Sequence, residues 1–200
     1  MFAQIPTSGG RGRLPAIVPE SRLESTEHGF VPKGDGWFVL NAREARWLHT
    51  PGRSAICEFE GYLEDEQDFL QFGINLNVLQ PGESMGLYHW EADQEDFLVL
   101  AGEALLIVEG EERPLRQWDL VHCPPETKHI IVGAGDAPCL VLAVGAREHS
   151  NGPDWGAYTV DEVARRHDVS VEEDTTDAKQ AYARFTKREP TRYREDWLPE

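Results

Sequence analysis

Two short stretches of the chain combine imidazole and carboxylate side chains at spacings that suit β-strands. The first contains His89, Glu91 and Glu95, and the second ends at His129, after a Pro-Pro turn. Because residues two apart share one face of a strand, His89 and Glu91 are predicted to project together. A short turn then lets Glu95 open the next strand. Imidazole nitrogen and carboxylate oxygen together suit Fe, Mn, Ni, Co or Zn, so these residues predict a divalent metal inside a small barrel.

The elements that would position these residues are short, regularly spaced strands. Apolar alternation and turn signals recur every 8 to 12 residues through the middle of the chain. That rhythm favours an antiparallel sandwich or barrel over βαβ units, so the predicted class is all-β. The expected strands span 37–40, 55–59, 72–79, 86–91, 95–100, 103–109, 113–115, 118–123, 129–132 and 138–145.

Both ends of the chain differ from this middle part. Residues 1–28 show no periodicity and are predicted to form a flexible N-terminal arm, followed by the barrel over 29–148. Residues 149–200 are predicted to form a helical tail, with a helix that begins at the N-cap Thr159 and a second helix over about 177–186. The tail is rich in aromatic residues, so we expect it to pack on the barrel or on a partner subunit.

Composition excludes several classes of partner. The net charge of −17 argues against binding to nucleic acid or to an anionic membrane, because both require a basic surface. No apolar run approaches the roughly 20 residues of a membrane span, and no signal peptide is recognisable. Three widely separated cysteines fit a reducing compartment, so the expected location is cytoplasmic.

With strands and ligands assigned, the segment 76–144 resembles the cupin superfamily, whose fold is a jelly-roll β-barrel. The first family motif matches Gly82, then His89-x-Glu91, Glu95 and Gly102, and the second matches Asp119-Leu120-Val121 through Pro124 to His129. The resemblance implies that His89, Glu95 and His129 are metal ligands. The chain departs from the family pattern in having Glu91 in place of the usual second histidine and Gly133 in place of an asparagine.

Glu91 affects the expected chemistry of the metal. A divalent ion with two neutral histidines and two carboxylates has no net charge, which weakens its Lewis acidity and favours the oxidised state of a redox metal. If Glu91 turns away, two histidines and one carboxylate resemble the open facial triad of non-haem iron oxygenases. Glu91 is therefore predicted to be a fourth ligand or a catalytic proton acceptor.

Four further residues near the motifs have two interpretations each. Asn75 and Asn77 share a strand face, which either lines the barrel and binds a polar substrate or, as is more common, faces outward with Ile74, Leu76 and Val78 inside. Cys123 is predicted to be a buried, inert thiol rather than a nucleophile. His122 has the opposite parity to Val121 and is predicted to lie on the surface or at an interface.

The sequence thus predicts a metal-binding barrel that acts on a small polar metabolite. The resemblance most often implies metal-dependent dioxygenase or isomerase chemistry. The alternatives are a non-catalytic small-ligand barrel, such as a sensor, or a barrel with no metal; no DNA-binding element accompanies the barrel, which disfavours a sensor. Exposed strand edges and the aromatic tail also predict a homodimer.

Overall fold

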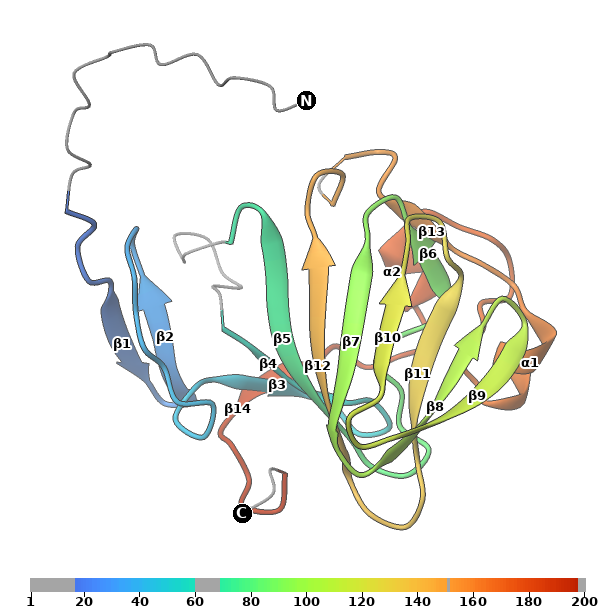
Figure 1. The fold of residues 1–200 in the computed structure, drawn as a ribbon, viewed down its shortest axis with the longest axis horizontal. Helices are drawn as coiled ribbons and strands as arrows, with labels where there is room; N and C mark the ends of the chain where they lie inside the picture. The colour runs from blue at the N-terminus through green and yellow to red at the C-terminus, as the bar shows by residue number, and fades with distance from the viewer. Residues whose placement is uncertain (1–16, 60–68, 151, 198–200) are drawn as a thin grey trace, which may run out of the picture.

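Antiparallel strands are the main secondary structure of the computed structural model, which describes residues 17–59, 69–150 and 152–197. The larger sheet has the order β10 (Leu120–Cys123), β7 (Glu95–Ala101), β12 (Cys139–Ala146), β5 (Phe72–Leu79), β4 (Ala55–Glu58), β3 (Trp47–His49) and β14 (Glu189–Thr191). The smaller sheet has the order β13 (Gly156–Tyr158), β6 (His89–Glu91), β11 (His129–Ala134), β8 (Glu103–Val108) and β9 (Glu111–Arg116). A separate hairpin of β1 (Arg22–Thr26) and β2 (Gly29–Lys33) lies beside the barrel (Figure 1). The predicted all-β jelly roll is confirmed.

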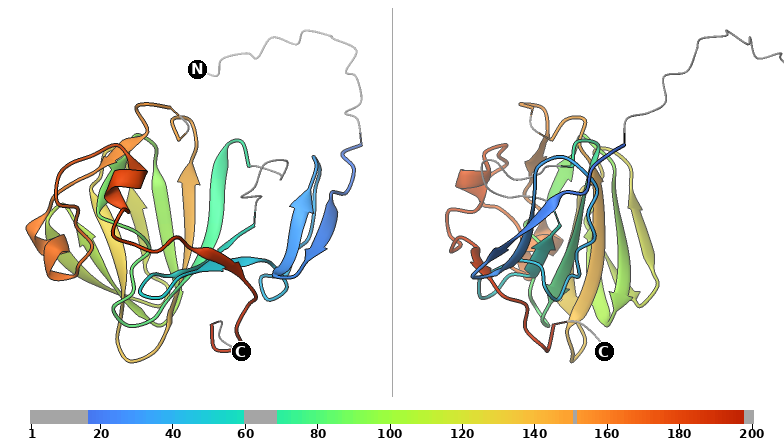
Figure 2. Two further views of the ribbon diagram at one scale, coloured as in Figure 1. Left: turned by 180° about the vertical axis from the view of Figure 1, so that it is seen from behind. Right: turned by 90° about the vertical axis from the view of Figure 1, so that its left-hand side faces the viewer.

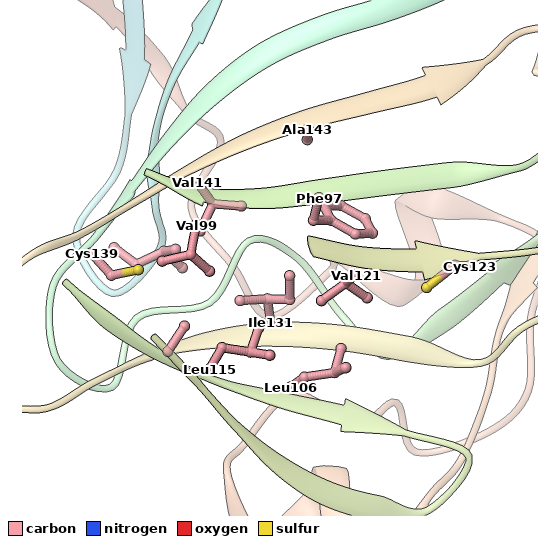
Figure 3. Close-up of a cluster of buried hydrophobic side chains, with 12 residues drawn as sticks. Phe97, Val99, Leu106, Leu115, Val121, Cys123, Ile131, Cys139, Val141 and Ala143 are labelled. Carbon is pink, nitrogen blue, oxygen red and sulfur yellow. The ribbon is translucent and has the colours of Figure 1, made fainter. Parts of the chain in front are cut away.

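The space between the two sheets is filled by the inward faces of their strands. Val99, Ile131 and Val141 are at most 1% exposed, and they come from three different strands that meet in one cluster (Figure 3). Apolar side chains that alternate along each strand supply this core, because period-2 alternation places them on one face. The cluster forms the floor beneath the polar cavity described below, since the ring of Phe97 lies 5.2 Å from that of His129, centroid to centroid.

The second half of strand β5 is covered on both faces, whereas the alternating sequence pattern predicts a strand that is buried on one face only. Leu79 lies in the barrel core, and Asn77, two residues earlier on the same face, is 1% exposed. On the opposite face, Val78 and Leu76 pack in a second cluster with Trp47. This apolar face therefore points away from the barrel interior, and other apolar residues cover it. The interpretation that placed the apolar face inside the barrel is wrong.

That cover comes partly from the tail. The ring of Trp197 lies 5.1 Å from that of Trp47, centroid to centroid, and β14 pairs with β3 next to it. Helix α1 (Glu162–Arg166) lies at the other end, where Ala164 packs on Ile107 and Ile130 outside the smaller sheet. Between the two, the tail passes through α2 (Ala178–Ala181) and along one side of the barrel (Figure 2). The tail thus contacts both sheets of its own barrel.

The structure corrects several local predictions. Residues 37–40 do not form a strand, because only Trp37 makes a bridge, to Glu20, while Val39 is 80% exposed. Strand β1 lies within the range predicted as an arm, whereas residues 1–16 are outside the described residues. Helix α1 begins after Asp161, not Thr159, because the Asp161 carboxylate accepts the Ala164 N–H at 2.8 Å.

The second predicted helix is much shorter than 177–186. It is the single turn of α2, capped by Asp177. None of the helices in the described ranges has the length and apolar composition needed to cross a membrane.

Candidate metal centre

The two candidate histidine ligands face each other across neighbouring strands of the smaller sheet. His89 on β6 pairs in register with His129 on β11, and their rings lie 5.1 Å apart, centroid to centroid. Each Nδ1 is hydrogen-bonded to a backbone carbonyl two residues earlier, at 2.8 Å to Leu87 O and 3.0 Å to Thr127 O. With Nδ1–H donating to these carbonyls, Nε2 of each ring keeps a lone pair for a metal.

The carboxylate comes from the opposite sheet. Glu95 opens β7, and its Oε2 lies 3.3 Å from His129 Nε2 and 3.8 Å from His89 Nε2. The neighbour of Glu95 across the strand pair is Gly145 on β12. The ligand atoms of His89, Glu95 and His129 all lie within 4.8 Å of one another, a spacing that one metal ion can bridge.

Two of these ligand atoms are buried without a hydrogen-bond partner among the described residues. They are Glu95 Oε2 and His129 Nε2, which are close but not aligned as donor and acceptor. Buried polar atoms without partners are costly, so such a pair points to a missing group between them. A divalent metal that accepts one lone pair from each atom fits this donor set.

The ionisation of the pair is shifted in a direction that suits a charged ligand set. Burial by itself would raise the pKa of Glu95, but contact with His129 and the charge of both imidazoles lower that pKa below its usual range. Burial opposes protonation of His129, yet its contacts with Cys123 and Glu95 raise its pKa to about 10. A metal would have to displace this proton, because an imidazolium has no lone pair at Nε2.

Glu91 lies beside this triad but outside the group whose ligand atoms are mutually close. Its Oε1 is 3.6 Å from His89 Nε2, and its side chain is 26% exposed, against 16% for Glu95. Both residues line the same cavity. Glu91 is therefore within reach of a molecule bound at the triad.

The cavity has a volume of about 490 Å³ and contains all six predicted site residues. These are His89, Glu91, Glu95, His129, Asn75 and Asn77. The Asn77 amide accepts from Ser54 Oγ at 3.0 Å and donates to Asn75 Oδ1 at 2.5 Å. Asn75 Nδ2 has no acceptor among the described residues, so it is the amide donor left for a ligand. Asn77 instead holds Asn75 in place.

The remaining cavity wall was not predicted. Tyr158 on β13 and Tyr182 after α2 come from the tail, and Arg53 and Arg188 come from segments on either side of the motif region. The Tyr158 ring lies 5.8 Å from the His89 ring, and burial together with its neighbour Tyr182 raises the pKa of its phenol. The aromatic content of the tail was the available signal for the tyrosines, whereas nothing in the local sequence identifies the arginines.

Other titratable residues near the motifs have structural roles. His122 lies on the outer face, 2.7 Å from Asp96, and Cys123 is buried in the barrel core, as predicted. His149, for which the sequence shows no partner, bonds through its backbone N–H and its Nδ1 to the buried Asp93 carboxylate, both at 2.7 Å. Glu148 lies near this pair. Gly133, at the family's asparagine position, approaches Gln80 O so closely that a Cβ would lie 2.3 Å from that oxygen.

Comparison with known proteins gives a consistent result. Residues 75–145 match the cupin domain family. A search of curated proteins found no match.

Among solved structures, a sugar phosphate isomerase from a cupin superfamily of Silicibacter pomeroyi is 29% identical, with a TM-score of 0.41, over 51% of this chain and 70% of that one. A Cupin 2 conserved barrel domain protein from Salinispora arenicola is 24% identical, with a TM-score of 0.42, over 50% and 82%. A proposed sugar phosphate isomerase from Acidithiobacillus ferrooxidans is 25% identical, with a TM-score of 0.40, over 48% and 62%, so this chain spans less than two thirds of it.

Proposed function

We propose that this chain, whose residues 75–145 match the cupin domain family, is a metal-dependent enzyme that acts on a small polar metabolite. The observation that carries the proposal is the pair of buried, unpartnered ligand atoms, Glu95 Oε2 and His129 Nε2, which converge with His89 in a cavity. His89, Glu95 and His129 would hold a divalent metal, one of Fe, Mn, Ni, Co or Zn. A bound metal of this kind supplies Lewis acidity toward an oxygen atom of the substrate.

The residues around the triad have the functions that proton-transfer chemistry requires. Glu91 is close enough to accept a proton from a substrate bound at the triad, since its Oε1 lies 3.6 Å from His89 Nε2. Asn75 Nδ2 donates a hydrogen bond to a polar group of the substrate. Tyr158 and Tyr182 line the cavity on the tail side and offer apolar ring faces to the substrate. This set supports isomerase-type chemistry, with Glu91 as the catalytic proton acceptor.

A second chemistry is favoured by the ligand set itself. Two histidines and one carboxylate form the triad of non-haem iron oxygenases when iron is bound. Dioxygenase activity would then require Fe(II) and would consume molecular oxygen, whereas isomerase activity would not. The bound metal and the oxygen balance therefore distinguish the two chemistries.

The test begins with elemental analysis of untagged protein. We expect one divalent metal per chain in the wild type and its loss in Glu95→Gln, while His122→Gln, which changes an imidazole on the outer face, keeps it. Metal-loaded protein is then incubated with a metabolite extract, and the consumed compounds are identified by mass spectrometry with an oxygen electrode in the same cell. Absence of metal after reconstitution would overturn the proposal. Retention of a compound without turnover would indicate a binding protein instead.

A further inference from the structure

A second cavity adjoins the metal cavity on the tail side. It has a volume of about 610 Å³ and shares four lining residues with the first, namely Arg53, Tyr158, Tyr182 and Arg188. Lys179 and Lys187 line it as well, and none of its lining residues is Asp or Glu. In a chain with a net charge of −17, a surface with four cations and no acid is locally positive.

Arg53 stands at the boundary between the two cavities and is nearly enclosed. The residue is 8% exposed, and its guanidinium carbon lies 4.4 Å from the centroid of the Tyr182 ring and 5.7 Å from that of Phe185. Within the described part of the chain, its side chain makes no hydrogen bond and no ion pair. Stacking uses the face of the guanidinium, so the N–H donors, which lie in its plane, remain available.

A buried charge without a counter-ion is costly, so an anionic ligand that pairs with the Arg53 guanidinium would be favoured. The rings of Tyr182 and Phe185 keep the guanidinium in place before any ligand binds, which lowers the entropy cost of binding. The planar fork of donors matches the two oxygens of a carboxylate or a phosphate.

Arg188 and Tyr158 line both cavities together with Arg53. Arg188 donates to Ser54 Oγ at 2.9 Å and to Met85 O at 2.9 Å, so its guanidinium has a fixed position beside the same cavities. The Tyr158 ring lies 5.8 Å from that of His89, centroid to centroid. Arg53 and the ligands of the metal centre line the same cavity.

From this juxtaposition we propose that the substrate is a small metabolite with a terminal oxyanion, either a carboxylate or a phosphate. The oxyanion enters through the basic outer cavity and is held by Arg53, while another oxygen of the same molecule reaches the metal centre. The contact between the substrate and the metal centre rests on the proposed function. The contact between the oxyanion and Arg53 does not, because it requires no metal.

The experiment measures anion binding by full-length protein, first stripped with a chelator and then loaded with Zn²⁺. The probes are inorganic phosphate, succinate and the uncharged succinamide, each followed by isothermal titration calorimetry. We expect metal-free wild type to bind phosphate or succinate but not succinamide, and the stronger of the two anions identifies the type of oxyanion. Arg53→Gln should weaken that binding about 10- to 100-fold, as loss of a charge-assisted contact does. Arg53→Lys should weaken it less, because the charge remains.

Arg184→Gln is the matched control. Arg184 also stacks on Phe185, at 4.8 Å, but it is exposed and paired with Asp168 at 2.9 Å. This variant should bind the anions as wild type does. Thermal unfolding of each variant confirms that it is folded.

The outcomes separate the two proposals. Equal anion affinity in Arg53→Gln and wild type would overturn the inference even if the metal is present. So would a lack of anion binding by wild type at a probe concentration of about 10 mM, which is about ten times the upper end of the usual KM range. Anion binding through Arg53 in a protein that takes up no metal would uphold it and overturn the proposed function. A lower unfolding temperature in Arg53→Gln with unchanged anion binding would show that Arg53 only packs on the rings.

Discussion

Replacement of His129 gives the sharpest test of the metal centre. Its imidazole is 3% exposed, and its Nε2 is one of the two buried ligand atoms without a partner. His129→Gln keeps a polar side chain of similar length but removes the imidazole ligand. Loss of a supporting residue outside the ligand set typically lowers metal affinity 10- to 100-fold, so loss of a ligand should reach at least about 100-fold.

The effect can be expressed as a change in unfolding temperature. At a metal concentration of about 100 times the wild-type Kd, binding stabilises the folded state by about 2.7 kcal/mol. For a chain of this size, each kcal/mol raises the midpoint by about 2–4 °C, so the wild type should gain about 5–11 °C. In His129→Gln the same metal concentration is only about equal to the Kd. The gain is then about 0.4 kcal/mol, or about 1 °C.

The assay is thermal unfolding of untagged, chelator-stripped protein, followed by circular dichroism with and without added metal. Each variant is compared with its own metal-free form, which removes any direct effect of the substitution on stability. His122→Gln is the control, because His122 lies on the outer face beside Asp96 and should keep the full gain. A gain in His129→Gln as large as in wild type would show that His129 does not bind the metal.

Four other predictions follow from the described contacts. Glu91→Gln should keep metal affinity and lower turnover about 10²- to 10⁴-fold, since Glu91 is proposed to accept a proton from the substrate. A loss of metal affinity of about 10- to 100-fold in a metal titration would show instead that Glu91 is a ligand. Trp197→Ala should lower the free energy of unfolding by about 3–5 kcal/mol because the indole is buried, whereas Trp118→Ala, at a site 67% exposed, should change it by less than about 0.5 kcal/mol; equal changes in urea titrations would refute this. His149→Gln should lower the midpoint of thermal unfolding at pH 5.5 but not at pH 9, since Asp93 raises the pKa of His149 in the folded state. The stabilisation is complete below the ordinary pKa of 6.5 and is lost as the pH rises through the raised pKa. Equal differences between variant and wild type at both pH values would exclude the ion pair. We also propose a homodimer, in which the exposed apolar side chains near the β1–β2 hairpin are covered, and light scattering should give twice the chain mass of 22.6 kDa rather than that mass itself.

The barrel could be predicted because its signals are local. Alternation of apolar residues marked most strands to within a few residues, and strand parity placed His89 and Glu91 on the same side. Residues 37–40 have the same apolar character but lack a neighbouring strand, and Val39 is left in solvent. Strand propensity therefore indicates a strand only where a partner exists to accept its hydrogen bonds.

The cavity wall could not be predicted, because its contacts join distant segments. The sequence pattern favours an outward position for Asn75 and Asn77, because an apolar face normally points into a barrel. The sequence does not show that Trp47 and Trp197 cover the apolar face from outside, which leaves the asparagine face inside. Ser54 and Arg188 are 134 positions apart and are joined only by the fold. Thr159 satisfies the capping pattern, but the Asp161 carboxylate is the group that accepts the Ala164 N–H.

The separation of Ser54 and Arg188 has a consequence for how the protein acquires its site. His89 and His129 come together when β6 pairs with β11, and Glu95 is only six positions from His89 along the chain, so the triad closes comparatively short loops at low entropy cost. The wall with Arg53 forms only after a far longer loop has closed, and contacts at such separation form slowly. We therefore expect refolding to restore metal uptake before anion selectivity. A trapped intermediate would then bind metal while its cavity stands open to any solute.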